Sequence, residues 1–266
     1  AVARECDGVI INCDSQQIYD GLPILSAQPP AEDKAEVPHL LYAALHPNEV
    51  CSAGNWREMV EPVIAEVIAR GQTPVICGGT GLYIRALMEG LSPMPDIPDE
   101  VRARVVAHYE AVEAEAFYAE LEARDPVMAA RFHVNHKARI IRAMEVLEAT
   151  GKSLAEWQEL PRTPPPADWE FEVRKILPAR EVLYERCNAR FDWMVENGAL
   201  EEARDFEALV QSGAVKDGVP LTKALGFKEL CAYMRGDMTR EDAMRAAKTA
   251  TRHYAKRQTT WFRNQL

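Results

Sequence analysis

The chain has 266 residues, 47% of them hydrophobic and 27% charged, which is ordinary for a globular protein with one large domain or a domain carrying an insertion. No apolar run approaches the roughly 20 residues that cross a bilayer, so we expect no membrane partner. The formal net charge of -10 excludes a protein that coats nucleic acid without specificity, because such binding requires cations that neutralise phosphates. The six cysteines are scattered and contain no C-x-x-C pair, which favours the reducing cytoplasm.

Two short apolar runs, residues 8–13 and 73–77, predict buried strands, and the helical pattern of residues 55–72 lies between them. Strands that alternate with helices indicate an α/β fold with a parallel sheet, in which ligands bind at the carboxyl ends of the strands. Asp14 follows the first run directly, and the turn "CGGTG" follows the second. We therefore expect Asp14 and this turn at the same edge of the sheet.

The glycine turn admits two readings. A glycine-rich turn that leads into a helix can hold an anion, but the same pattern occurs in a plain strand-turn-helix connection in which Thr80 caps the helix that begins near Leu82. The sequence leaves both readings open.

The composition changes after Leu91. The proline-rich segments "SPMPDIPDE" and "ELPRTPPPADWE" enclose a long helical region rich in Ala, Glu and Arg. We predict an all-helical insertion over residues 95–168, and an α/β core with a helical C-terminal part from residues 1–94 and 169–266. The segment "EFEVRKILP", residues 170–178, resembles a returning strand.

The last helix differs in charge from the rest of the chain. From Arg245 to Leu266 there are six basic residues and no Asp or Glu. Arg245, Lys248, Arg252 and Lys256 follow a helical spacing that places them in one stripe. We expect this stripe to contact a phosphate backbone.

Several segments together, in this order, resemble the tRNA dimethylallyltransferases, also called isopentenyl-tRNA transferases. They are "INCDSQQIYDGLPILSAQP", "VPHLLYAALHPNE", "GGTGLYIRALMEGLSPMP", "EVRARV", "ARIIRAMEVLEATGKS", "KALGFKEL" and "TRHYAKRQTTWFR". The resemblance spans essentially the whole chain. It implies a P-loop-NTPase-like parallel sheet flanked by helices, with an all-helical insertion domain that contacts tRNA.

The resemblance also implies the reaction. A dimethylallyl group passes from dimethylallyl diphosphate to the exocyclic N6 amine of the adenosine 3′ to the anticodon, with Mg2+ on the diphosphate and the tRNA anticodon stem-loop as partner of a monomeric enzyme. Asp14 is the expected general base, and Thr80 supplies a hydroxyl beside the reacting groups. The plain alternative for Asp14 is a hydrogen bond to loop amides.

Matching positions extend the expected site. The expected tRNA-binding residues are Asp14, Ser15, Gln16, Gln17, Thr80, Arg102, Ala138, Arg139, Ile140, Ile141, Arg142, Arg252 and Lys256, and the expected diphosphate contact is Lys223. Pairing with nearby acids is the plain alternative for the arginines of the insertion. A flipped base is expected, since its edge cannot be reached inside a stacked loop.

Three departures from the family pattern stand out. The phosphate-binding loop G-x-x-x-x-G-K-[ST] is absent, and "AVARECDG" resembles the end of the helix that follows it. Either the first segment is missing from this chain or pyrophosphate binding has been lost, and the retention of every later motif favours the first explanation. Gln28 stands where relatives have lysine, and Ala138 where they have glutamine.

Two other functions fit parts of the sequence. One is an isopentenyltransferase that acts on free adenine nucleotides, or a nucleotide kinase-like enzyme, although neither needs the helical insertion or the basic end. The other is a catalytically silent RNA-binding protein without the phosphate loop.

Overall fold

The computed structural model describes residues 1–266, which divide into two compact units. The core unit contains Ala1–Leu87 and Glu170–Leu266, and the helical unit contains Met88–Trp169. The helical unit thus begins seven residues before the predicted insertion, residues 95–168, and ends one residue after it. The two units are described separately below.

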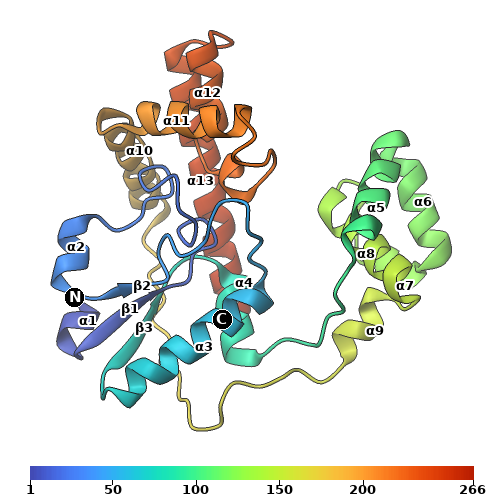
Figure 1. Ribbon diagram of the computed structural model, residues 1–266, viewed down its shortest axis with the longest axis horizontal. Coiled ribbons are helices and arrows are strands. Elements are labelled where there is room, and N and C mark those ends of the chain that lie inside the picture. Colours follow the sequence, from blue (N-terminus) through green and yellow to red (C-terminus); the bar gives the residue numbers. More distant parts are fainter. The chain divides into compact units, whose positions relative to one another are not determined.

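The core unit holds all three strands (Figure 1). Its first half consists of α1 (Val2–Glu5), β1 (Gly8–Asn12), α2 (Ala31–Glu36), β2 (His39–Leu40), α3 (Ala53–Ala69), β3 (Thr73–Cys77) and the start of α4 (Gly81–Glu89). Its second half consists of α10 (Arg180–Glu196), α11 (Ala199–Gln211), the 3-10 helix η1 (Pro220–Lys223), α12 (Phe227–Arg235) and α13 (Arg240–Gln265).

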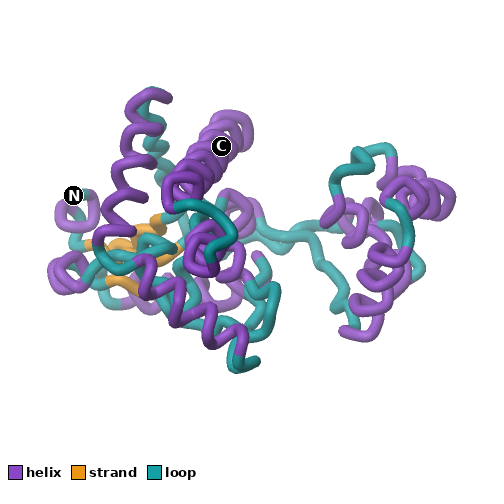
Figure 2. Tube along the Cα trace, turned by 90° about the horizontal axis from the view of Figure 1, so that it is seen from above, coloured by secondary structure: helices purple, strands orange, loops and turns teal.

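The sheet is parallel and has the order β2-β1-β3, which confirms the predicted α/β class. β1 is the central strand and pairs with β3 from Gly8 opposite Thr73 to Asn12 opposite Cys77. Figure 2 shows helices on both sides of the strands. β1 is almost entirely buried, whereas β3 lies at the end of the strand order, its first and last residues are exposed, and no other strand pairs with its outer side.

The helix α3 crosses from the sheet edge back to β3 and begins at a capping box. The Ser52 side chain accepts a hydrogen bond from the Asn55 amide, and the Asn55 side chain accepts one from the Ser52 amide. Trp56 on the first turn is fully buried and donates from Nε1 to the carbonyl of Asn12 over 3.1 Å. This bond ties the start of α3 to the carboxyl end of β1.

The predicted returning strand at residues 170–178 is wrong. The segment has no regular structure, and the side chain of Ile176 is 87% exposed. The alternation of apolar and charged residues is typical of a strand, but a strand also needs a neighbour that pairs with its backbone groups. Residues 170–178 pair with neither edge of the sheet.

The helical unit contains α5 (Asp99–Ala111), α6 (Ala114–Arg124), α7 (Pro126–Ala129), α8 (Lys137–Thr150) and α9 (Leu154–Glu159). It has a core of its own in which Phe117, Leu121, Met128, Ile140 and Met144 are almost completely buried. The all-helical character predicted for this region is therefore observed, and its apolar residues are used in packing the helices together.

The C-terminal helices pack around α13, which has 26 residues and contacts both α10 and α12. The Thr239 side chain accepts a hydrogen bond from the Asp242 amide and so caps its first turn. No helix of the chain combines the length and apolar character that crossing a bilayer requires. The six cysteines are all unpaired.

We predict that Gly78→Ala destabilises the protein strongly. A Cβ at Gly78 would lie 2.2 Å from the carbonyl carbon and oxygen of Cys13, so the ends of β1 and β3 would have to separate. Overpacking of this kind costs about 1–3 kcal/mol. Urea denaturation measures the loss. The control is Gly54→Ala in α3, where there is room for a methyl group. Because alanine loses less conformational entropy than glycine in a helix, this variant should gain roughly 0.5–1 kcal/mol in the free energy of unfolding. Equal stability of the two variants would contradict the prediction.

Candidate active site

The loop that leaves β1 is organised by the buried side chain of Asn12. Its Oδ1 accepts from the Asp14 amide at 2.9 Å, and its Nδ2 donates to the carbonyls of Asp14 at 3.1 Å and Leu41 at 3.0 Å. A buried amide with all these groups paired is strongly held, because any lost partner would leave a desolvated polar group. Asn12 therefore directs the chain out of the sheet at Asp14. The sequence analysis did not identify this role, although a polar residue at the end of an apolar run was a signal for it.

The carboxylate of Asp14 has two oxygens with different roles. Oδ1 accepts from the amides of Gln16 at 2.8 Å and Gln17 at 3.3 Å, which is the plain role considered for this residue. Oδ2 accepts no hydrogen bond from the protein. The loop-forming role and the proposed role as a base are thus compatible, because each uses a different oxygen.

Burial raises the pKa of Asp14, and this effect exceeds the lowering by the amides of Gln16 and Gln17 and by the charge of Arg190. A carboxylate whose pKa is raised holds a proton more strongly, which makes it a better general base as long as it is ionised at the working pH. The environment of Asp14 therefore suits proton abstraction.

Thr80 joins the same loop from the end of β3. Its Oγ1 accepts from the Ser15 amide at 2.9 Å and donates to the Ser15 hydroxyl at 3.3 Å, while its amide donates to the Cys13 carbonyl at 3.2 Å. The hydroxyl makes no bond that caps α4, so that alternative is not observed. The structure brings Asp14, Ser15 and Thr80 together, as expected from the carboxyl ends of adjacent parallel strands.

The two glutamines after Ser15 differ in what they can offer a ligand. The Nε2 of Gln17 donates to the carbonyls of Ser26 at 2.9 Å and Ala27 at 2.8 Å, so the prediction that its donors read a base is not supported. The Oε1 of Gln16 has no partner but is buried, so it can accept from a ligand only after the side chain moves. Spacing alone could not distinguish these two neighbours, because the loop at residues 22–28 folds back over only one of them.

Side chains hold the loop at residues 22–28 in place. Glu202 of α11 accepts from the amides of Ile24 at 2.7 Å and Leu25 at 2.8 Å. The Nε2 of Gln28 donates to the carbonyl of Tyr19 at 2.9 Å. Gln28 stands where relatives have lysine, and here its amide stabilises the loop.

Packing against α13 explains two glycines of the "CGGTG" turn. The Nε2 of Gln258 donates to the Gly79 carbonyl at 3.0 Å and would lie 2.1 Å from a Cβ at Gly79. A Cβ at Gly81 would lie 2.3 Å from the ring of Trp261. Close approach of α13 accounts for glycine at both positions, so these glycines give no support to the anion-binding interpretation, although the helix cap by Thr80 is not formed either.

Aromatic and thiol side chains line the surroundings of Asp14. Burial raises the pKa of Cys77 and Tyr254, and the charge of Asp14 adds to the rise in each case. Burial likewise raises the pKa of Tyr42, with further contributions from Cys77 and Asp14. Cys77 ends β3, Tyr42 follows β2, and Tyr254 lies on α13. None of the three was identified from the sequence, because they come from separate elements.

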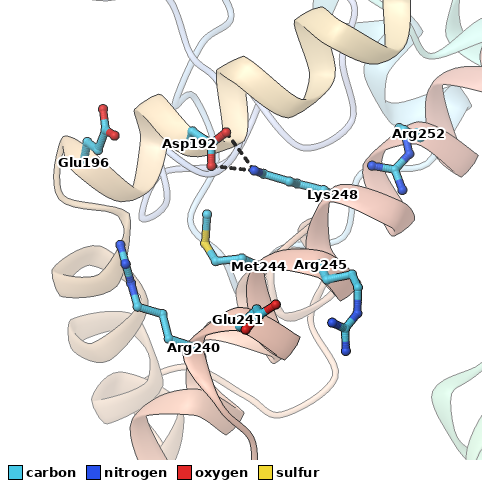
Figure 3. Close-up of a pocket in the computed structure, with 8 residues that line it drawn as sticks. All are labelled: Asp192, Glu196, Arg240, Glu241, Met244, Arg245, Lys248 and Arg252. Atoms are coloured by element: carbon cyan, nitrogen blue, oxygen red, sulfur yellow. Dashed lines mark hydrogen bonds and ion pairs between the residues drawn. The ribbon is translucent and has the colours of Figure 1, made fainter.

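Two members of the predicted basic stripe of α13 bond to other side chains. Lys248 forms an ion pair with Asp192 of α10 at 2.6 Å (Figure 3). Arg252 donates to Asn188 at 2.7 Å and to Thr249 at 2.8 Å. Asp192, Lys248 and Arg252 lie along a cavity of about 670 Å³ between α10 and α13, whose lining also includes the acidic side chains of Glu196 and Glu241. The expectation of a continuous phosphate-binding stripe is therefore wrong for Lys248, whose charge is neutralised from α10.

Lys256 lies on the exposed side of α13, and its side chain makes no hydrogen bond or ion pair. Arg252 is half-buried and keeps part of its guanidinium unbonded. Lys223, the expected diphosphate contact, is exposed at the end of η1 and also has no partner. Contacts of these three residues with tRNA or diphosphate stay predictions.

The expected tRNA contacts in the helical unit fall into two groups. Arg102, Ala138 and Arg139 are exposed, and Arg142 is half-buried beside Glu145 at 3.4 Å. The side chains of Ile140 and Ile141 belong to the core of the unit, with 0% and 9% exposure, so side-chain contacts with tRNA from these positions are excluded in this structure. They follow Arg139 on the helix, and the helical period turns them inward.

No group of three or more His, Cys, Asp and Glu side chains in the structure could hold a metal ion. Asp14 Oδ2 is a single carboxylate oxygen, whereas Mg2+ takes near-octahedral coordination from oxygens that often include substrate phosphates. The residues described here do not form a metal site by themselves.

Comparisons with known proteins show the family of the chain. The family model described as IPP transferase matches residues 17–265. The tRNA dimethylallyltransferase of Paramagnetospirillum magneticum is 47% identical over 266 residues, covering 100% of this chain and 82% of that protein. The enzyme of the same name from Rhodospirillum centenum is 46% identical over 265 residues, covering 100% and 83%.

Solved structures show the same fold. The tRNA isopentenylpyrophosphate transferase of Bacillus halodurans matches with a TM-score of 0.64 and 33% identity over 99% of this chain and 81% of that one. A eukaryotic dimethylallyltransferase acting on tRNA matches with a TM-score of 0.75 and 25% identity over 98% and 64%. The fold and these matches together identify the protein class as prenyltransferases. The chain belongs to the IPP transferase family, which confirms the predicted family and its parallel-sheet fold.

We predict that Asp14→Asn leaves the protein at least as stable as the wild type at pH 8. Because the folded-state pKa of Asp14 is raised, its ionised form opposes folding above that pKa, and protonation at lower pH removes the cost. An amide oxygen can still accept from Gln16 and Gln17. Thermal unfolding should show an advantage for the variant that shrinks as the pH falls toward 4. The variant Asp20→Asn, at an exposed position, serves as control. A large loss of stability in Asp14→Asn at pH 8 would contradict the raised pKa of Asp14.

Proposed function

We propose that this protein is a tRNA dimethylallyltransferase that transfers the dimethylallyl group of dimethylallyl diphosphate to the exocyclic N6 amine of the adenosine 3′ to the anticodon. The observation that carries the proposal is the unbonded Oδ2 of Asp14 beside the paired hydroxyls of Ser15 and Thr80. It occurs in a chain that matches the IPP transferase family over residues 17–265. The names of its relatives supply the substrate class.

The chemistry requires help at the nitrogen. The exocyclic amine of adenine is a weak nucleophile because its lone pair is delocalised into the ring. Oδ2 of Asp14 accepts a hydrogen bond from this amine and takes its proton as the N6–carbon bond forms. The carbon–oxygen bond of the donor breaks, and its electron pair leaves with the diphosphate.

Neutral groups around Asp14 suit recognition of the base. The Thr80 hydroxyl already donates to Ser15, so the Ser15 hydroxyl keeps its own hydrogen as a donor to a ligand and Thr80 Oγ1 keeps one lone pair as an acceptor. Reading of an adenine edge requires one donor and one acceptor in a fixed arrangement. The hydrogen bond between the Ser15 amide and Thr80 fixes the position of both hydroxyls.

The proposed RNA contacts outside the Asp14 site are exposed cations. Arg102 and Arg139 of the helical unit and Lys256 of the core unit are each proposed to meet phosphates of the tRNA, and the enzyme is proposed to act as a monomer. Lys223 is proposed to meet the diphosphate of the donor. We propose Mg2+ only as a partner of that diphosphate, because this chain's side chains form no metal cluster and no step requires one.

The other two functions have less support. The relatives are named as enzymes that act on tRNA, and none of their names refers to a free nucleotide or a kinase. A silent RNA-binding protein would have no need of a half-buried carboxylate with a raised pKa and a free oxygen.

We predict prenylation of an anticodon stem-loop by the full-length protein in the presence of dimethylallyl diphosphate and Mg2+, detected as a mass gain on the adenosine. Asp14→Asn should lower kcat by a factor on the order of 10² or more, the usual effect of removing a general base, and leave the RNA Kd nearly unchanged. For the wild type, kcat/KM should rise with pH through the raised pKa of Asp14. Unchanged turnover in Asp14→Asn would remove this residue as the base.

We also predict that Arg139→Gln weakens binding of the stem-loop and lowers the salt dependence of log Kd by about 1, as expected for the loss of one phosphate contact. Arg104→Gln is the matched control on the same unit, because Arg104 is already paired with Glu148 at 2.9 Å. Fluorescence anisotropy at several salt concentrations measures both variants. Equal salt slopes for Arg139→Gln and the wild type would exclude Arg139 as a phosphate contact.

A further inference from the structure

One face of α13 lies along the turn at residues 77–81, which contains Thr80. Tyr254, Gln258 and Trp261 are spaced at i, i+4 and i+7, which places them on the same side of a helix. Gln258 donates to the Gly79 carbonyl, and Trp261 packs against Gly81. Since two members of this face contact residues on either side of Thr80, the third, Tyr254, lies one turn further along the same face.

Asp14 and Tyr254 are close enough to interact. The charge of Asp14 opposes ionisation of the Tyr254 hydroxyl and contributes to its raised pKa after burial. The two residues come from opposite parts of the core unit, the loop after β1 and the last helix. Tyr254 therefore lies in the surroundings of Asp14, on the face of α13 that contacts Gly79 and Gly81.

The ring of Tyr254 is held on two sides. On one side Gln258 follows one turn later on the same face of α13, where its Nε2 is anchored to the Gly79 carbonyl. The guanidinium of Arg257 lies 5.6 Å from the ring centroid. The side chain is still only half-buried. A ring that is fixed before a ligand arrives loses little entropy on binding it.

One exposed cation stands beside this ring. Arg257 follows Tyr254 by three residues, which places both on one side of α13, and its side chain is exposed. A nucleic acid strand with a phosphate at Arg257 brings a base to Tyr254. A base that has left its stack needs a new surface for its faces, and aromatic side chains commonly supply it.

We propose that the ring of Tyr254 stacks on the target purine and sets the plane of the base so that its exocyclic amine meets Asp14. This proposal rests on the proposed function and names one more residue that contacts its substrate. The other aromatic side chain near Asp14, Tyr42, packs edge-on against His39 at 5.6 Å and has no exposed cation adjacent in the chain. The observations therefore favour Tyr254.

The test uses an anticodon stem-loop with 2-aminopurine at the target position, whose fluorescence is quenched when it stacks. The wild-type protein should quench it. Tyr254→Phe keeps the ring and should retain the quench, whereas Tyr254→Leu should lose it and weaken Kd by roughly 10-fold or more, the scale of one base–aromatic stack. Tyr233→Leu on α12 is the matched control and should behave like the wild type. Circular dichroism verifies folding of each variant.

An equal quench with Tyr254→Leu and the wild type would overturn the proposal, as would loss of the quench in Tyr42→Leu alone. If Tyr254→Leu does not fold, Tyr254→Trp gives a second reading, since a larger ring should deepen the quench and an unchanged quench would overturn the proposal. Prenyl transfer by the wild type to the adenosine stem-loop is measured separately. A stacking result without transfer would refute the proposed function, and transfer without stacking would refute only the role of Tyr254.

Discussion

The site depends on one buried amide. Asn12 ends the central strand with no exposed surface, and its side chain makes three hydrogen bonds that fix the exit of the chain and hold the loop after β2 beside it. Trp56 bonds to its backbone from α3. A buried amide tolerates few alternative arrangements, because every unpaired group inside a protein is costly. Asp14 is consequently presented in one position, with one oxygen used by the loop and the other free.

The second constraint comes from the other end of the chain. Helix α13 approaches the turn after β3 so closely that Gly79 and Gly81 have no room for a side chain. Its basic residues are divided between two tasks, since Lys248 balances Asp192 within the fold and Lys256 faces outward. Helix α13 thus links an exposed basic surface to the turn after β3 without an intervening flexible segment, and under the proposed function it would align a bound RNA strand with Asp14.

The sequence allowed prediction of features that depend on local pattern. The two apolar runs, the position of Asp14 after the first, and the helical insertion between proline-rich borders all follow from short-range spacing. Features that depend on residues distant in the chain could not be predicted from the sequence. Asp192 neutralises Lys248 from 56 residues away, the loop at residues 22–28 captures Gln17, and the segment at 170–178 finds no neighbouring strand. Ile140 and Ile141 were placed at the RNA by resemblance, whereas their hydrophobicity predicts the burial that is observed.

The position of β3 at the end of the strand order has a consequence for association with other molecules. Its outer side pairs with no strand, and an open strand edge can template a strand from another chain. Pro74 in the segment "TPVIC" has no amide hydrogen to donate, so it interrupts the ladder that such a strand would need. The proline therefore limits growth of the sheet beyond β3.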